Sequence, residues 1–204
     1  MRYIPLVILW IAWCFIHSGM ISITVTGYMK TKLGKFYKFY RIIFNSVALI
    51  TLVPLILYSQ HFKGNILFQW KGYLSFVQII LFAVSMILFI AGASKYDILE
   101  FSGIRQIITG RSYSALSEKG EIATSGILGV TRHPWYLGAV IFIWVAYKEM
   151  YVSTLIVNTL LTLYLIVGTL LEERKIILEF GKDYRNYMAR VSMLFPFKWL
   201  LSRL

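Results

Sequence analysis

A cation, an imidazole, a proline and two aromatic rings follow one another in the stretch Arg132-His133-Pro134-Trp135-Tyr136. Proline fits the first turn of a helix, where the backbone N–H that it lacks would have no partner. Arg132 and His133 then lie beside the free N–H groups of that helix, where a cation is unfavourable without an anionic partner. We therefore expect an anionic group here, such as a ligand carboxylate. A basic cluster that faces lipid headgroups is the alternative, but it leaves the His-Pro-x-Tyr pattern unexplained.

Two adjacent carboxylates, Glu172 and Glu173, stand at the end of a second apolar run. The two runs, Pro134 to Ala146 and Tyr151 to Leu171, are separated by only a few residues and are predicted to form a tight hairpin. The end that carries Arg132 and the end that carries the carboxylates then become neighbours. Groups of both charge signs suit a zwitterionic ligand that also has a ribose. On its own, the acidic pair would be interpreted as a solvated helix end.

The composition is that of an integral membrane protein. Of the 204 residues 58% are hydrophobic and 15% are charged, and the mean hydropathy is +0.69, whereas a soluble domain is about half apolar and about a quarter charged. The net charge of +12 is explained by cytoplasmic loops and anionic lipids, so we expect the lipid bilayer and no nucleic acid as a partner. Cys14 is the single cysteine, and no Cys/His spacing suggests a metal.

The elements that must position these residues are helices. Apolar runs of roughly 20 residues predict spanning helices, and the chain predicts an all-α membrane protein with about five of them plus cytoplasmic amphipathic helices. The expected spans are 4–25, 39–58, 72–93, 134–150 and 151–171, and the expected amphipathic stretches lie at 98–108 and 176–191, with a loop at 110–126. We expect residues 1–95 to form a three-span membrane region and residues 96–204 to form the catalytic part.

Basic residues are distributed unevenly over the predicted loops. Loop 26–41 has five, stretch 94–133 has five and the tail from 172 has seven, against Arg2, Lys63, Lys71 and Lys148 elsewhere. Cytoplasmic loops carry the excess of Lys and Arg. The sequence therefore predicts a multi-pass protein with its N-terminus outside, and with its active site and C-terminus in the cytoplasm.

Three further candidate residues lie outside the hairpin. His17 falls within the first apolar run, where a histidine is a functional candidate by default; a His17–Ser18 pair that bonds to a neighbouring helix explains it equally well. Arg105 and Gln106 lie on the amphipathic stretch before the expected loop.

An ordered set of motifs carries a family resemblance. The motifs are Arg132-His133-Pro134-Trp135-Tyr136-Leu137-Gly138, then Glu172-Glu173-Arg174, then Phe180-Gly181-Lys182-Asp183-Tyr184-Arg185-Asn186-Tyr187, then Phe195-Pro196. This order resembles the isoprenylcysteine carboxyl methyltransferase and phospholipid methyltransferase superfamily of integral membrane methyltransferases. Tyr96-Asp97, Gly103-Ile104-Arg105-Gln106 and Val191-Ser192-Met193-Leu194 further resemble the methanethiol S-methyltransferase branch.

The resemblance implies an S-adenosylmethionine-dependent methyltransferase, with S-adenosyl-L-methionine as its cofactor on the cytoplasmic side and no metal. The positions that it assigns to cofactor binding are Gly126, Leu128, His133, Tyr136, Leu137, Glu172 and Glu173. Arg105, Arg132 and His133 are the predicted catalytic residues. Arg105, Gln106 and His17 are the predicted substrate-binding residues. The expected acceptor is a small or lipophilic thiol such as methanethiol, and Arg105 is the cation that would lower the pKa of that thiol.

The sequence departs from the family at two positions and leaves other functions open. Leu128 replaces a tyrosine of many relatives, and Ser192 replaces a proline usual in the thiol-methylating branch. The acceptor could instead be a prenylcysteine carboxylate or a phospholipid amine. A non-catalytic transporter or scaffold is a further alternative, although a transporter site would lie near the membrane midplane. A nicotinamide-dependent reductase is the last alternative.

Overall fold

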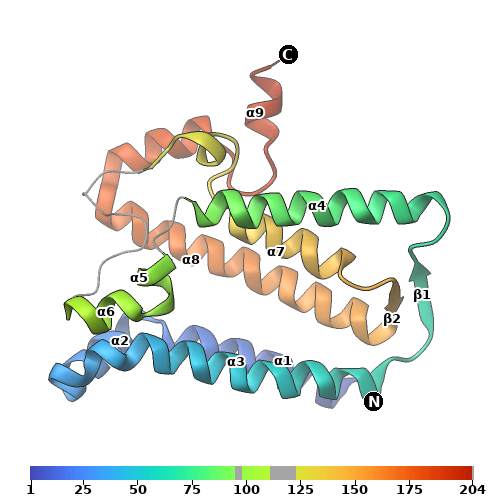
Figure 1. The fold of residues 1–204 in the computed structure, drawn as a ribbon, viewed down its shortest axis with the longest axis horizontal. Helices are drawn as coiled ribbons and strands as arrows, with labels where there is room; N and C mark the ends of the chain where they lie inside the picture. Colours follow the sequence, from blue (N-terminus) through green and yellow to red (C-terminus); the bar gives the residue numbers. More distant parts are fainter. Residues whose placement is uncertain (95–97, 111–122, 204) are drawn as a thin grey trace. The chain divides into compact units, whose positions relative to one another are not determined.

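The described residues are mostly helical, which confirms the predicted all-α membrane fold (Figure 1). The computed structural model describes residues 1–94, 98–110 and 123–203. The predicted boundary at 95/96, the cations Lys95, Arg111 and Lys119 and most of the predicted loop 110–126 lie outside these residues. The elements are α1 (Ile4–Met20), α2 (Ile23–Leu33), η1 (Gly34–Phe39), α3 (Tyr40–Ser59), η2 (Gln60–Phe62), β1 (Ile66–Gln69), α4 (Tyr73–Ala93), α5 (Ile98–Ser102), α6 (Ile104–Thr109), η3 (Gly126–Gly129), α7 (Pro134–Val145), β2 (Glu149–Tyr151), α8 (Val152–Arg190) and α9 (Phe197–Leu201).

Three helical runs in the described residues are long and apolar enough to cross a membrane. They are Ile23–Phe62, which comprises α2, η1, α3 and η2, then Tyr73–Ala93 and Val152–Arg190. The other two apolar helices, α1 with 17 residues and α7 with 12, are shorter. At 1.5 Å per residue α7 measures about 18 Å, against about 30 Å for the hydrocarbon core of a bilayer. The number of five spans therefore stays a prediction.

The chain divides into two compact units. Unit 1 contains residues 1–68, 97–115 and 150–160, and unit 2 contains residues 69–96, 116–149 and 161–204. The division passes through both β1 and β2, which form a two-stranded sheet. The sequence analysis did not predict this sheet, because its strands have only four and three residues, too few to show an alternating pattern.

In unit 1, α1 and α3 are joined by indole hydrogen bonds. Trp10 Nε1 donates to Ser59 Oγ and Trp13 Nε1 donates to Thr51 Oγ1, each over 3.0 Å. The first apolar run ends as a helix at Met20 rather than near residue 25. Ser22 causes this difference, because its hydroxyl accepts a hydrogen bond from Val25 N over 3.3 Å and so caps a new helix, α2.

In unit 2, α4 and α7 pack against each other, and a side-chain hydrogen bond joins them toward each end of α4. At one end, Gln78 Nε2 donates to Val145 O over 2.8 Å, which satisfies a carbonyl of the last turn of α7. Toward the other end, Trp135 Nε1 donates to Phe89 O over 3.0 Å. Because Phe89 lies near the end of α4, the start of α7 lies at the end of α4 opposite to Gln78.

The last long helix bends later than expected. We predicted separate apolar and amphipathic segments that meet near residue 172, but α8 continues through both of them. Its break is at Gly181, whose φ of 55° and ψ of −117° are not helical. A positive φ is readily adopted only by glycine, so the short segment beyond Gly181 can leave the direction of the preceding helix.

The packing of α4 on α7 predicts the effect of two alanine substitutions. A Cβ at Gly92 would lie 2.0 Å from Cδ1 of Trp135, and this indole is rigid and held by its bond to Phe89 O. We expect Gly92→Ala to lower stability by about 1–3 kcal/mol through overpacking. Gly27→Ala is the control, because in the described structure a Cβ at Gly27 meets no atom within 4 Å. Thermal unfolding in detergent, followed by circular dichroism, should show a lower Tm for the first variant and an equal or higher Tm for the second.

Candidate functional site

The residues before α7 form an extended segment that pairs with the chain after α8. Thr131 and Ser192 form a parallel β-bridge. Arg132 N donates to Ser192 O over 3.0 Å, and His133 N donates to Met193 O over 3.2 Å. Pro134 then begins α7, as predicted for the first turn of a helix. Backbone pairing thus fixes the positions of Arg132 and His133 independently of the contacts that their side chains make.

The Arg132 guanidinium is buried and fully engaged. Its Nε and Nη2 each lie 2.6 Å from Oε1 of Glu173, and both side chains are 6% exposed. Its Nη1 donates to the carbonyl of Met188 over 3.3 Å and also to that of Val191. The structure therefore places Arg132 and Glu173 in contact across the predicted hairpin. These four contacts join Arg132 to α8 and to the residue after it, and its catalytic role stays a prediction.

His133 is the buried member of the cluster that keeps an unused polar atom. The residue is 2% exposed, and its Nε2 lies 3.1 Å from Oε1 of Glu173. Its Nδ1 is buried and has no hydrogen-bond partner among the described residues. In the neutral tautomer that carries its proton on Nε2, the imidazole donates this hydrogen bond to Glu173. Nδ1 then presents a lone pair.

Two tyrosines beyond Gly181 form hydrogen bonds at this cluster. Tyr184 OH donates to Oε1 of Glu173 over 3.3 Å, and Tyr187 OH donates to the carbonyl of Leu128 over 2.5 Å. Both rings are buried, in a small core with Ile176 and Val191. The sequence analysis quoted these tyrosines in a motif but did not assign them to the site. Their spacing of three residues, which places both on one helix face, was the available signal.

The electrostatics of the cluster favour an ionised Glu173. This residue lies beyond the apolar part of α8, which ends at Leu171. Burial raises the pKa of its carboxyl group, but hydrogen bonds from His133 and Arg132 outweigh burial, so the pKa is lowered. The resulting stabilisation is present above the ordinary glutamate pKa and is lost as the pH falls through the lowered value. Burial raises the pKa of Tyr187 to about 12, so its hydroxyl remains a donor.

The other residues predicted for cofactor binding lie around this cluster in unit 2. Tyr136 is half-buried, and its ring meets that of His133 edge-on at 5.7 Å between centroids. Glu172 and Leu137 are half-buried, and Leu128 is 2% exposed. Gly126 starts η3 with a φ of 67°. Glu173 alone of the acidic pair enters the buried cluster.

The residues predicted to bind the acceptor belong to unit 1. Gln106 is buried, and its Nε2 donates to Oε1 of Glu100 over 2.6 Å. Arg105 is the half-buried residue before it. The ring of His17 stacks on Trp13 at 5.0 Å. Their role in acceptor binding stays a prediction from the sequence.

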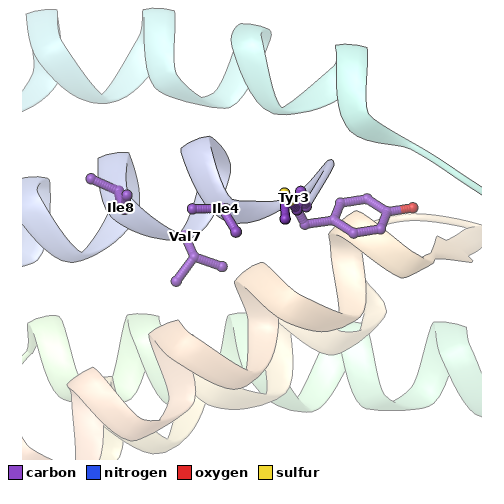
Figure 2. A pocket seen from close by; sticks show the side chains of 5 residues that line it. Tyr3, Ile4, Val7 and Ile8 are labelled. Atoms are coloured by element: carbon purple, nitrogen blue, oxygen red, sulfur yellow. The ribbon is translucent and has the colours of Figure 1, made fainter.

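Unit 1 also has a hollow of about 270 Å³ at the start of α1 (Figure 2). Met1, Tyr3, Ile4, Val7 and Ile8 line it. All five are apolar or aromatic, and none of them is a predicted site residue. The hollow therefore contributes no chemistry to the candidate site.

The buried ion pair predicts a specific stability loss. Removing one partner leaves an uncompensated buried charge, which typically costs about 3–5 kcal/mol. We expect Glu173→Gln and Arg132→Ala each to destabilise the protein by an amount of this order, and the double variant to lose less than the sum. Asp183→Asn, an exposed carboxylate on the same helix, is the control and should change stability little. Equal Tm values for Glu173→Gln and Asp183→Asn in detergent would show that the pair is not stabilising.

Comparison with known proteins agrees with the resemblance seen in the sequence. The methanethiol S-methyltransferase of Pseudomonas deceptionensis is 35% identical over 97 residues, which are 48% of this chain and 36% of that protein. The methanethiol S-methyltransferase of Crocosphaera subtropica is 27% identical over 162 residues, 76% of this chain and 59% of the relative. The chain therefore spans less than two thirds of the length of each of these relatives.

A relative with a different name aligns over more of the chain. The chloroplastic 15-cis-zeta-carotene isomerase of Zea mays is 22% identical over 204 residues, 98% of this chain and 51% of that protein. No solved structure matches the chain. The family model described as "NnrU protein" matches residues 5–198. These similarities confirm the predicted relationship to the methanethiol S-methyltransferase-like membrane proteins, and the chain belongs to the NnrU family.

Proposed function

We propose that this protein is an S-adenosylmethionine-dependent membrane methyltransferase that methylates the sulfur of a small thiol. The observation that carries the proposal is the buried cluster at the start of α7, where Arg132 and Glu173 balance in charge and Nδ1 of His133 has no partner among the described residues. A buried polar atom without a partner is unfavourable unless a ligand or water satisfies it. The similarity to methanethiol S-methyltransferases supports methyl transfer as the reaction.

The hydrogen-bonding groups around the cluster fit a zwitterionic cofactor. His133 Nδ1 can accept a hydrogen bond, the Tyr136 hydroxyl can donate one, and the half-buried Glu172 can accept from an ammonium or a ribose hydroxyl. We propose that these three residues hold the cofactor, with Gly126, Leu128 and Leu137 beside them. S-adenosylmethionine supplies an electrophilic methyl group on its sulfonium when bound.

Arg132 and Glu173 act in this proposal as positioning residues. Glu173 accepts the Nε2 proton of His133 and thereby sets the tautomer that leaves the lone pair on Nδ1. Arg132 holds Glu173 and the chain after α8 together. Methyl transfer requires alignment and exclusion of water more than acid–base strength, and the low exposure of this cluster, with side chains 6% exposed or less, supports that role.

A thiol acceptor must lose its proton during the reaction. Arg105 remains the cation predicted from the sequence to favour the thiolate, with Gln106 and His17 as the other acceptor contacts. A prenylcysteine carboxylate and a phospholipid amine are the alternative acceptors.

A product assay tests the proposed activity. The purified full chain would be incubated with methyl-labelled cofactor and small thiols, prenylcysteine, phosphatidylethanolamine or 15-cis-zeta-carotene, and the products identified by mass spectrometry. We expect label in the thioether of a small thiol. Label in prenylcysteine or the phospholipid alone would change the acceptor but keep the reaction class. Isomerisation of the carotene with no labelled product would overturn the methyltransferase proposal.

Cofactor affinity provides a separate prediction. His133→Ala should weaken S-adenosylmethionine binding by about 1.5–3 kcal/mol, since a hydrogen bond to a charged group is lost. The matched control is His61→Ala, because His61 is exposed and lies in η2 of unit 1. Calorimetric titration should show full affinity for the control. Unchanged affinity in a folded His133→Ala protein would remove His133 from the site.

The membrane orientation predicted from the charges is also part of the proposal. We expect the loop from Lys30 to Arg41 and the C-terminal tail to lie in the cytoplasm. In a Cys14→Ser background, Lys35→Cys should react with an impermeant maleimide only after the cells are permeabilised. Lys63→Cys should react in intact cells. Labelling of residue 35 from outside would contradict this orientation.

A further inference from the structure

The chain between α1 and α3 concentrates positive charge without any compensating acid. Residues 28–41, here called the basic turn, contain Lys30, Lys32, Lys35, Lys38 and Arg41. The sequence has no Asp or Glu before Asp97. The basic turn therefore carries a charge of +5 that its own part of the chain cannot neutralise.

The structure places the basic turn at one end of a helix pair in unit 1. Helix α2 and the 3-10 helix η1 connect α1 to α3, and they lie at the end of that pair opposite to the N-terminus (Figure 1). Gly34 lets the chain reverse between them, because its φ of 50° is one that glycine adopts readily. If α1 and α3 both cross the bilayer, as the sequence predicts, the connection between them lies near the headgroups.

Four of the five cations are available to a partner. Lys30, Lys32 and Lys35 are exposed and Lys38 is half-buried, and none of the four forms an ion pair within the described residues. Arg41 differs, because its Nε donates to the carbonyl of Phe101 over 3.2 Å and it thereby joins α3 to α5. The lysines, and not the arginine, form the free part of the surface.

Exposed aromatic and aliphatic side chains alternate with these lysines. Tyr28 is 58% exposed and Phe36 is 59% exposed. The Lys32 ammonium lies 5.7 Å from the ring centre of Tyr28, and the Lys35 ammonium lies 5.4 Å from that of Phe36. A purely electrostatic surface for a soluble polyanion does not need exposed rings, whereas a bilayer surface offers phosphate and acyl chain together.

We propose that the basic turn binds the headgroups of anionic glycerophospholipids. The ammonium groups of the four lysines pair with lipid phosphates, and Tyr28 and Phe36 insert their rings at the level of the glycerol backbone. Juxtamembrane cations are attracted by an anionic leaflet and lose that attraction as salt rises. This binding is separate from the proposed methyl transfer, since none of these residues belongs to the candidate site.

Lipid enrichment tests the proposal on the full chain. The protein would be placed in nanodiscs with equal amounts of phosphatidylglycerol and phosphatidylcholine, released with mild detergent, and its retained lipids measured by native mass spectrometry. We expect phosphatidylglycerol to be enriched on the wild type, and the enrichment to fall as salt rises. The variant K30Q/K32Q/K35Q/K38Q should lose at least about tenfold in affinity for phosphatidylglycerol.

A control variant with the same change in net charge distinguishes an effect of the basic turn from an effect of the overall charge. The chain offers R2Q/K63Q/K71Q/K148Q, which removes four exposed cations outside the basic turn and should keep the enrichment. The variant K30R/K32R/K35R/K38R should also keep it. If circular dichroism shows that K30Q/K32Q/K35Q/K38Q does not fold, the arginine variant and the salt dependence of the wild type test the proposal instead. Lack of enrichment on the wild type, enrichment unaffected by salt, or equal loss in both glutamine variants would overturn the proposal.

Discussion

The ion pair between Arg132 and Glu173 is the interaction on which the candidate site depends. Two opposite charges that are 6% exposed gain from each other only if the remaining donors are also satisfied, because the loss of hydration is large. Here the remaining donors reach Met188 O and Val191 O. One guanidinium therefore joins the start of α7, the polar part of α8 and the chain that follows α8. The imidazole of His133 is oriented by the same carboxylate oxygen.

The sequence predicted the central pair because a short hairpin between two apolar runs leaves little freedom. It could not predict which carboxylate would enter the cluster. Neighbouring residues on a helix point about 100° apart, so only one of Glu172 and Glu173 can face Arg132, and the choice depends on how α8 is rotated. It also could not place Ser192 and Met193 beside Thr131 and His133, because that backbone pairing has no side-chain pattern.

Helix positions were predicted well where length and apolar composition determine them, as in α3 and α4. The predicted helix boundaries were wrong where a single residue determines the end of a helix or a break within it. A serine hydroxyl ends the first apolar segment early by capping α2, and one glycine in α8, rather than the change from apolar to charged residues, sets the break at residue 181. Such local hydrogen bonds and backbone angles leave almost no trace in hydropathy. The small sheet was missed for the same reason.

The order in which the ribosome delivers the chain follows from the contacts of Arg132. Its three partners lie 41, 56 and 59 residues downstream. When Arg132 is added to the growing chain, neither the carboxylate nor the two carbonyls has yet been made. The cation must then remain hydrated, and it becomes buried only after α8 and the residues that follow it have folded against α7. The candidate site therefore cannot form until the chain as far as Val191 has been synthesised.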